Sequence, residues 1–136
     1  MLIFADTSAL FALLVRNDLG HAAAKANFED LMKQRARLLT SSYVLLETLT
    51  LLQRRVSLEA VFDFNHKFMP LLEVVWVDET WHARALQRLQ AERSRSLSLT
   101  DCLSFEIMEA EEIDTAFSVD RHFSERGFKM AALQED

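Results

Sequence analysis

Two short apolar runs in this chain each end in an aspartate. Residues 2–5 (LIFA) precede Asp6, and residues 115–119 (TAFSV) precede Asp120. Short runs rich in apolar and β-branched residues predict buried strands. In an open α/β sheet, the carboxyl ends of parallel strands face a common crevice in which ligands bind. We therefore expect Asp6 and Asp120 to lie close together, although they come from opposite ends of the sequence.

Strand and helix patterns alternate along the rest of the chain. Further strands are predicted at residues 38–40, 72–77 and 128–131, and helices at 9–15, 21–35, 42–54, from Ser57 towards Pro70, around Trp81 to Leu89, and at 99–112. Alternation of this kind favours an α/β fold in which a central, mostly parallel sheet is flanked by helices on both faces.

The chain is expected to form a single domain that spans residues 1–136. It contains only two glycines and one proline, so no flexible linker is predicted. Its apolar runs are far shorter than the roughly 20 residues that cross a bilayer, and no membrane segment or signal peptide is expected. A single cysteine excludes an internal disulfide, and these features together favour a cytoplasmic location.

The net charge of −6 is unusual for a protein that binds nucleic acid, which usually presents a basic surface. Four of the negative charges belong to Asp6, Glu47, Asp101 and Asp120, so the rest of the chain carries −2. A bound cation at these acids would change the local field again. The charge therefore does not exclude a nucleic-acid substrate.

Glu47 is the only charged residue between Leu38 and Gln53. Val44 and Leu51 flank it on its own helix face, so a solvated position is not expected. A buried, unpaired carboxylate is costly and needs a metal, a cationic partner or a proton. A functional site is the favoured interpretation, and an internal ion pair with an arginine is the alternative.

The other three acids each have a structural interpretation as well. Asp6 and Asp120 could cap helices or occupy turns, and the pattern from Ser98 to Asp101 matches a capping box. Capping and metal binding do not exclude each other, because a helix N-terminus projects its first side chains outward.

Four carboxylates that cluster repel one another unless a cation neutralises them. Oxygen ligands without a pattern of Cys or His ligands select Mg²⁺ or Mn²⁺ rather than zinc. The four histidines are scattered and are expected to be surface or packing residues; they are His21, His66, His82 and His122. The residues thus predict a divalent-metal site built from acids alone.

Four segments together resemble the PIN-domain ribonucleases, and most of all the VapC-type toxins of toxin–antitoxin systems. The segments are residues 6–10 (DTSAL), Glu47 in a helix after two serines, residues 98–102 (SLTDC) and residues 116–123 (AFSVDRHF). The resemblance covers essentially the whole chain in order. Ser118 stands where many members of this family carry threonine, which keeps the hydroxyl.

The resemblance implies a PIN-like fold and Mg²⁺- or Mn²⁺-dependent endonucleolytic cleavage of RNA. Asp6, Glu47, Asp101 and Asp120 would be the catalytic, metal-binding acids. The hydroxyls of Thr7, Ser8 and Ser118 would contact these acids or a substrate phosphate. A small inhibitory antitoxin and a homodimer are the implied protein partners.

Such a site would cleave RNA through a metal-activated water and leave a 5′-phosphate and a 3′-hydroxyl. Arg121, Arg93 and Arg95 are the local candidates to bind phosphates, although a basic loop is often merely solvated. Two other functions stay open from sequence: a catalytically silent interaction module, and a metal-dependent nuclease of RNA processing without a toxin role. Five apolar residues could form core or a dimer surface, and core is favoured: Val61, Phe62, Phe64, Phe68 and Met69.

Overall fold

A computed structural model describes residues 1–131; residues 132–136 of the expected domain lie outside the described part. Its strands are β1 (Leu2–Ala5), β2 (Arg37–Ser41), β3 (Leu72–Val75), β4 (Thr115–Phe117) and β5 (Lys129–Met130). Its helices are α1 (Thr7–Leu14), α2 (His21–Lys33), α3 (Ser42–Arg55), α4 (Leu58–Asp63), α5 (Glu79–Glu92), α6 (Leu99–Ala110) and α7 (Arg121–Glu125). A π-turn (Phe64–Phe68) and a 3₁₀ turn (Met69–Leu71) join α4 to β3.

The five strands form one parallel sheet in the order β3-β2-β1-β4-β5. From the central β1 the chain builds β2 and β3 on one side, then returns to add β4 and β5 on the other. The strand order therefore reverses between β1 and β4, where Phe4 pairs with Ala116 and the Asp6 N–H donates to the Phe117 carbonyl at 3.0 Å. A reversal of this kind opens a crevice at the carboxyl ends of the strands.

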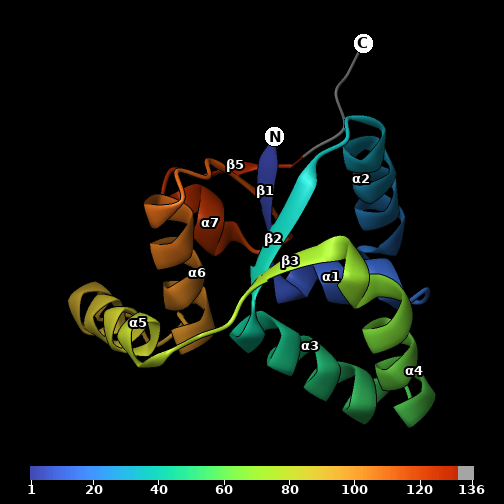
Figure 1. Ribbon diagram of the computed structural model, residues 1–136, viewed down its shortest axis with the longest axis horizontal. Coiled ribbons are helices and arrows are strands. Elements are labelled where there is room, and N and C mark those ends of the chain that lie inside the picture. The colour runs from blue at the N-terminus through green and yellow to red at the C-terminus, as the bar shows by residue number, and fades with distance from the viewer. Residues whose placement is uncertain (132–136) are drawn as a thin grey trace.

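Helices cover the sheet from two sides. In Figure 1, α5, α6 and α7 lie on one side of the strands, and α2 and α4 lie on the other. The sequence prediction of a parallel sheet flanked by helices on both faces is confirmed. Within residues 1–131, no helix is both long and apolar enough to cross a bilayer.

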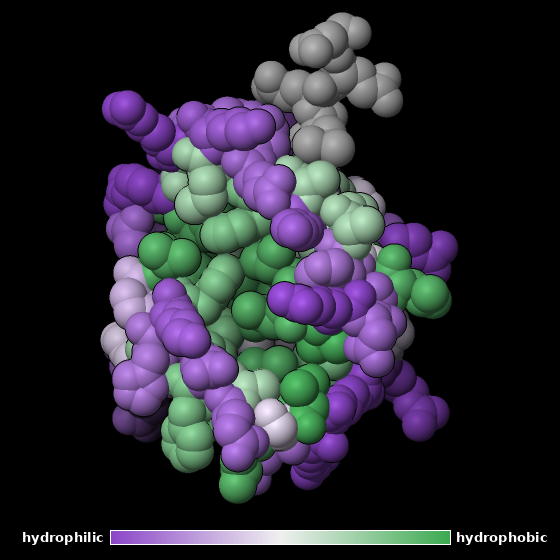
Figure 2. Space-filling view, turned by 90° about the vertical axis from the view of Figure 1, so that its right-hand side faces the viewer, coloured by the Kyte–Doolittle hydropathy of each residue, from purple (hydrophilic) through white to green (hydrophobic). Residues whose placement is uncertain are grey.

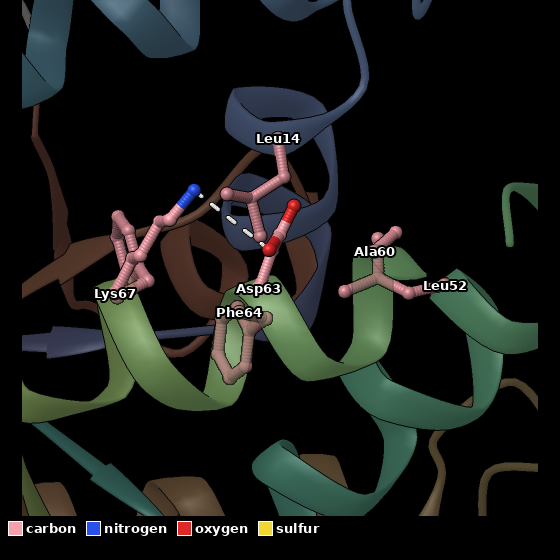
Figure 3. Close-up of a pocket in the computed structure, with 7 residues that line it drawn as sticks. Leu14, Leu52, Ala60, Asp63, Phe64 and Lys67 are labelled. Atoms are coloured by element: carbon pink, nitrogen blue, oxygen red, sulfur yellow. Dashed lines mark ion pairs between the residues drawn. The ribbon is translucent and has the colours of Figure 1, made fainter. Parts of the chain in front are cut away.

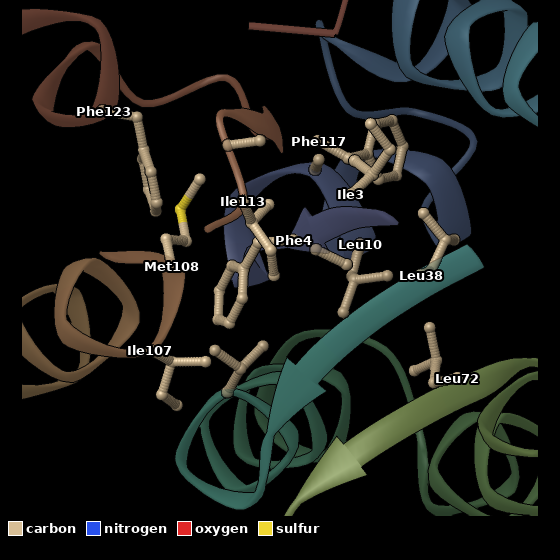
Figure 4. Packing of buried hydrophobic residues seen from close by; sticks show 14 of the residues in the cluster. Ile3, Phe4, Leu10, Leu38, Leu72, Ile107, Met108, Ile113, Phe117 and Phe123 are labelled. Atoms are coloured by element: carbon tan, nitrogen blue, oxygen red, sulfur yellow. The ribbon is translucent and has the colours of Figure 1, made fainter. Parts of the chain in front are cut away.

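The core fills the space between sheet and helices (Figure 4). Its largest fully buried side chains include Phe4, Phe105, Phe117 and Phe123. Phe105 of α6 and Phe123 of α7 meet edge-on with ring centroids 5.0 Å apart. Helix α6 buries residues on almost every face, including Asp101 in its first turn, so its position is fixed by packing.

β3 and β4 end earlier than predicted by two residues each, and β5 ends one residue early. β3 stops at Val75 and β4 at Phe117, each two residues before the predicted end. Just beyond each of these two strand ends a serine hydroxyl accepts the backbone N–H that the ladder no longer pairs: Val77 N–H donates to Ser42 Oγ at 2.9 Å, and Val119 N–H donates to Ser8 Oγ at 3.0 Å.

The apolar segment after α3 contributes to the core, as favoured from sequence, with one exception. Phe64 is buried, and Val61, Phe68 and Met69 pack against the core. Phe62 is 58% exposed, so the interpretation as core is wrong for that residue.

Candidate metal centre

Asp6 lies immediately after β1, where it caps α1. Its Oδ2 accepts hydrogen bonds from the Ser8 N–H at 3.3 Å, the Ser8 hydroxyl at 2.7 Å and the Ser118 hydroxyl at 3.1 Å. Within residues 1–131, Oδ1 takes part in no hydrogen bond. Capping thus uses one oxygen and leaves the other available to a ligand.

Asp120 comes shortly after β4, the strand that pairs with β1. It caps α7 through Oδ1, which accepts the His122 N–H at 2.9 Å. Ser118 joins this turn to Asp6, because its hydroxyl accepts the Asp120 N–H at 3.0 Å and donates to Asp6. The two aspartates therefore share a hydrogen-bonded serine at the point where the strand order reverses.

Asp101 completes the capping box of α6. Its N–H donates to Ser98 Oγ at 3.0 Å, and its Oδ2 accepts the Ser98 N–H at 3.3 Å. The structural interpretation from sequence is therefore correct. Asp101 Oδ1 makes no hydrogen bond within residues 1–131, so the capping box does not occupy the whole carboxylate.

Burial and mutual repulsion perturb the carboxylates. Burial raises the pKa of Asp6 to about 6; the charge of Asp101 adds to this rise, and hydrogen bonds from Ser8 and Ser118 oppose it. Burial also raises the pKa of Asp101, and the charges of Asp120 and Glu47 raise it further. Asp101 is thus near enough to the other three acids for charge repulsion. A bound cation would reduce this repulsion.

Glu47 lies in the second turn of α3 and is half-buried. It lines an open hollow of about 450 Å³ between α3 and the start of α6, together with Tyr43, Leu46, Thr50, Leu51, Arg54 and Thr100. No ion pair within residues 1–131 involves Glu47, so the arginine partner considered from sequence is not formed. Glu47 lies near enough to Asp101 for its charge to raise the pKa of Asp101.

A histidine belongs to the cluster and was missed from sequence. Asp101, Asp120 and His122 offer donor atoms that all lie within 4.8 Å of one another. His122 Nδ1 is 3.1 Å from Asp120 Oδ1 and 3.4 Å from Asp101 Oδ2. The sequence led us to expect a surface or packing residue here, whereas the structure places the His122 ring beside two carboxylates; its position two residues after Asp120, in a capped turn, was the available signal.

The remaining candidates from sequence occupy different places. Thr7 is buried and donates to the Val44 carbonyl of α3 at 3.4 Å, so its hydroxyl faces the protein rather than the acids. Arg121 begins α7, Arg93 ends α5 in a left-handed conformation, and Arg95 follows in the loop. All three arginines are exposed, and none of them forms an ion pair within the described residues.

A second hollow lies between α1, α3, α4 and the π-turn (Figure 3). Its lining is mainly apolar, with one ion pair between Lys67 Nζ and Asp63 Oδ1 at 3.7 Å. Viewed from the side of α2 and α4, hydrophobic residues gather in the middle of the face and hydrophilic residues surround them (Figure 2). Among residues 1–131, the group of candidate metal ligands lies elsewhere, at Asp101, Asp120 and His122.

The donor set at the strand ends fits a hard divalent cation. Carboxylate oxygens predominate, and within residues 1–131 Asp6 Oδ1 and Asp101 Oδ1 accept no hydrogen bond. Burial and repulsion destabilise the charged forms of Asp6 and Asp101. A divalent ion held here would sit beside an open hollow that can admit a substrate, an arrangement suited to metal-assisted hydrolysis.

Residues 3–129 match the model of the PIN domain family. Over 128 residues the chain is 32% identical to the 23S rRNA-specific endonuclease VapC20 of Mycobacterium tuberculosis, covering 93% of this chain and 95% of that protein. The crystal structure of VapC20, described as a sarcin-ricin loop cleaving toxin, matches over the same shares with a TM-score of 0.81.

Two more distant structures share the fold. VapBC2 from Rickettsia felis, bound to a DNA fragment from its promoter, matches with a TM-score of 0.70 at 16% identity and covers 96% of this chain and 97% of that one. FitAcB from Neisseria gonorrhoeae matches with a TM-score of 0.68 at 12% identity and 96% coverage of both chains.

Proposed function

This chain belongs to the PIN domain family, and on that premise we propose that it is a divalent-metal-dependent endoribonuclease, the toxin of a toxin–antitoxin pair. The observation that supports the proposal is that Asp101 and Asp120 offer oxygens close enough to share one cation, while Asp6 and Glu47 lie near enough for their charges to act on Asp101, in a fold shared with an RNA-cleaving toxin. The whole chain, residues 1–136, is taken to form one such domain.

The substrate class follows from the relative at 32% identity, which acts on 23S rRNA. RNA is therefore the proposed substrate, and structured ribosomal RNA is the first to assay. An enzyme with this substrate meets it in the cytoplasm, the location that the sequence led us to expect.

Asp6, Glu47, Asp101 and Asp120 are the proposed ligands of Mg²⁺ or Mn²⁺. When bound, such a cation supplies a Lewis acid at the scissile phosphate and lowers the pKa of the attacking water. Ser8 and Ser118 hold the Asp6 carboxylate through Oδ2 and so fix the direction of its free oxygen. Products with a 5′-phosphate and a 3′-hydroxyl are expected.

The chain's own cations are proposed to position the RNA. Arg121 lies next to Asp120, and Arg93 and Arg95 form the loop that leads into α6, so all three belong to the segments that border the acids. Their guanidinium groups have no carboxylate partner within residues 1–131 and can bind phosphates that flank the cut.

A small antitoxin is the proposed protein partner, and a homodimer is the proposed assembly. The apolar face in Figure 2 and the hollow between α1, α3 and α4, whose apolar lining is bordered by Asp63 and Lys67, could receive side chains of such a partner. Apolar surface of this kind commonly marks protein–protein contacts.

The direct test is cleavage of ribosomal RNA by the purified protein with Mg²⁺, with Mn²⁺ and with EDTA. Metal-dependent cuts with 5′-phosphate ends are expected, and they should disappear in Asp120→Asn. Absence of metal binding would instead favour the catalytically silent interaction module.

A further inference from the structure

The imidazole of His122 faces two of the acids directly. Its Nδ1 is 3.1 Å from Asp120 Oδ1, 3.2 Å from Asp120 Oδ2 and 3.4 Å from Asp101 Oδ2. The side chain is only 22% exposed. The nitrogen is thus placed between oxygens of both carboxylates rather than beside one of them.

The fold fixes this placement from several sides. The His122 N–H donates to Asp120 Oδ1, and its carbonyl accepts a hydrogen bond from Arg126 Nη1 at 3.1 Å. Arg126 is itself bound to Glu92 of α5. The next residue, Phe123, is fully buried. The backbone that carries the imidazole is therefore held at both ends, which keeps the Cα of His122 next to the two acids.

The donor atoms have the spacing of ligands around one cation. Two ligands at right angles, each about 2.1 Å from a metal, are about 3 Å apart. Imidazole nitrogen suits transition metals, whereas Mg²⁺ prefers oxygen ligands and water. A site with one nitrogen and two carboxylates therefore differs in selectivity from one built of carboxylates alone.

We infer that His122 Nδ1 is a direct metal ligand, which with Asp101 and Asp120 forms a mixed nitrogen–oxygen site that prefers Mn²⁺ to Mg²⁺. The inference rests on the proposed function and deepens it, because it names the metal that this site selects. It adds a nitrogen to the donor set of four acids. The rival role for His122 is that of a hydrogen-bond donor that only orients the carboxylates.

The variant His122→Asn separates these two roles. The asparagine amide can still donate a hydrogen bond towards Asp120, but it has no imidazole nitrogen to offer a cation. A matched control is His66→Asn, because His66 is exposed on the π-turn and its Nδ1 contacts only the Phe62 carbonyl at 2.7 Å. Thermal unfolding in EDTA checks that both variants are folded.

The experiment uses the full chain, stripped with EDTA and loaded with Mn²⁺. Pulsed EPR is expected to show ¹⁴N coupling to Mn²⁺ in the wild type and in His66→Asn, and none in His122→Asn. By calorimetry, the Kd for Mn²⁺ should rise on the order of 10- to 100-fold in His122→Asn, while the Kd for Mg²⁺ changes much less.

Mn²⁺ bound to the wild type without ¹⁴N coupling would overturn the inference and leave the proposed function intact, since His122 would then act by hydrogen bonding alone. Equal loss of Mn²⁺ and Mg²⁺ affinity in His122→Asn would also overturn it. Failure of the wild type to bind either metal would overturn both the inference and the proposed metal centre. The decisive spectrum is that of the wild type, so it does not depend on the folding of a variant.

Discussion

The hydroxyl oxygens of Ser8 and Ser118 lie 3.1 Å apart, although 110 residues separate them in the sequence. Both hydroxyls donate to Asp6 Oδ2, and each also accepts a backbone N–H from the turn after β4. This hydrogen-bonded cluster therefore joins the ends of β1 and β4, and it orients Asp6 and Asp120, two of the proposed metal ligands.

Ser118→Ala should weaken this junction. The change removes a donor to Asp6 and the acceptor of the Asp120 N–H, at a cost of about 1 kcal/mol of stability. Because the ligands lose their support, metal affinity should fall on the order of 10-fold or more. Calorimetry with Mn²⁺ measures the effect, and Ser118→Thr, which keeps the hydroxyl, is the control. Equal affinities of the Ala and Thr variants would contradict the positioning role.

The pKa of about 6 for Asp6 predicts how stability depends on pH in the metal-free protein. Below about pH 4 the carboxyl is protonated in both the folded and the unfolded state. Between about pH 4 and 6 the unfolded state loses the proton first, so the free energy of unfolding falls as pH rises, by about 3 kcal/mol in all. Above about pH 6 this contribution is constant.

Asp6→Asn should remove that step. Denaturant unfolding in EDTA at several pH values between 4 and 7 compares the variant with the wild type, and Asp63→Asn, at an exposed site on α4, is the control. If wild type and Asp6→Asn lose stability in parallel over this range, Asp6 is not the group responsible.

Asp101→Asn tests whether the charge of Asp101 is repelled by the neighbouring acids in the metal-free protein. The amide oxygen can still accept the Ser98 N–H, so the capping box is kept while the charge is removed. In EDTA the variant should unfold at the same temperature as the wild type or higher. Mn²⁺ at 100 times its Kd should stabilise the wild type by about 2.7 kcal/mol and the variant much less. A variant that is less stable in EDTA and equally stabilised by Mn²⁺ would reduce Asp101 to a helix cap.

Arg121→Ala should weaken RNA binding and lower the dependence of log Kd on log salt concentration by about 1, as expected when one phosphate contact is lost. The measurement is RNA binding at several salt concentrations with Ca²⁺ in place of the catalytic ion. Lys25→Ala serves as the control, because Lys25 is an exposed cation on α2, on the opposite side of the sheet. Equal effects of both substitutions would show that Arg121 contributes only general charge.

The sequence predicted the parts of this site that depend on local patterns. A short apolar run followed by Asp6 indicates a strand end, and the pattern from Ser98 to Asp101 indicates a helix start, because both signals lie within a few residues. Sequence reasoning allowed capping and metal binding together; the structure shows that capping engages only Oδ2 of Asp6 and of Asp101, so Oδ1 of each accepts no hydrogen bond within residues 1–131.

Other features depended on contacts between distant segments. No local pattern indicates that Ser8 meets Ser118, that Thr7 turns towards α3, or that His122 reaches Asp101, because each requires the strand order that one sequence does not give. His122 in particular reads as an ordinary histidine until α7 is placed against the start of α6.

Cleavage of ribosomal RNA tests the central claim most directly. Purified wild type and Asp120→Asn are incubated with the RNA in Mg²⁺, Mn²⁺ or EDTA, and the fragments are ligated to an adaptor that accepts only 5′-phosphate ends. We predict discrete cuts by the wild type with either metal, ligatable 5′ ends, and no cuts in EDTA or by Asp120→Asn. Cleavage that persists in EDTA or in Asp120→Asn would contradict a metal-dependent mechanism built on these acids.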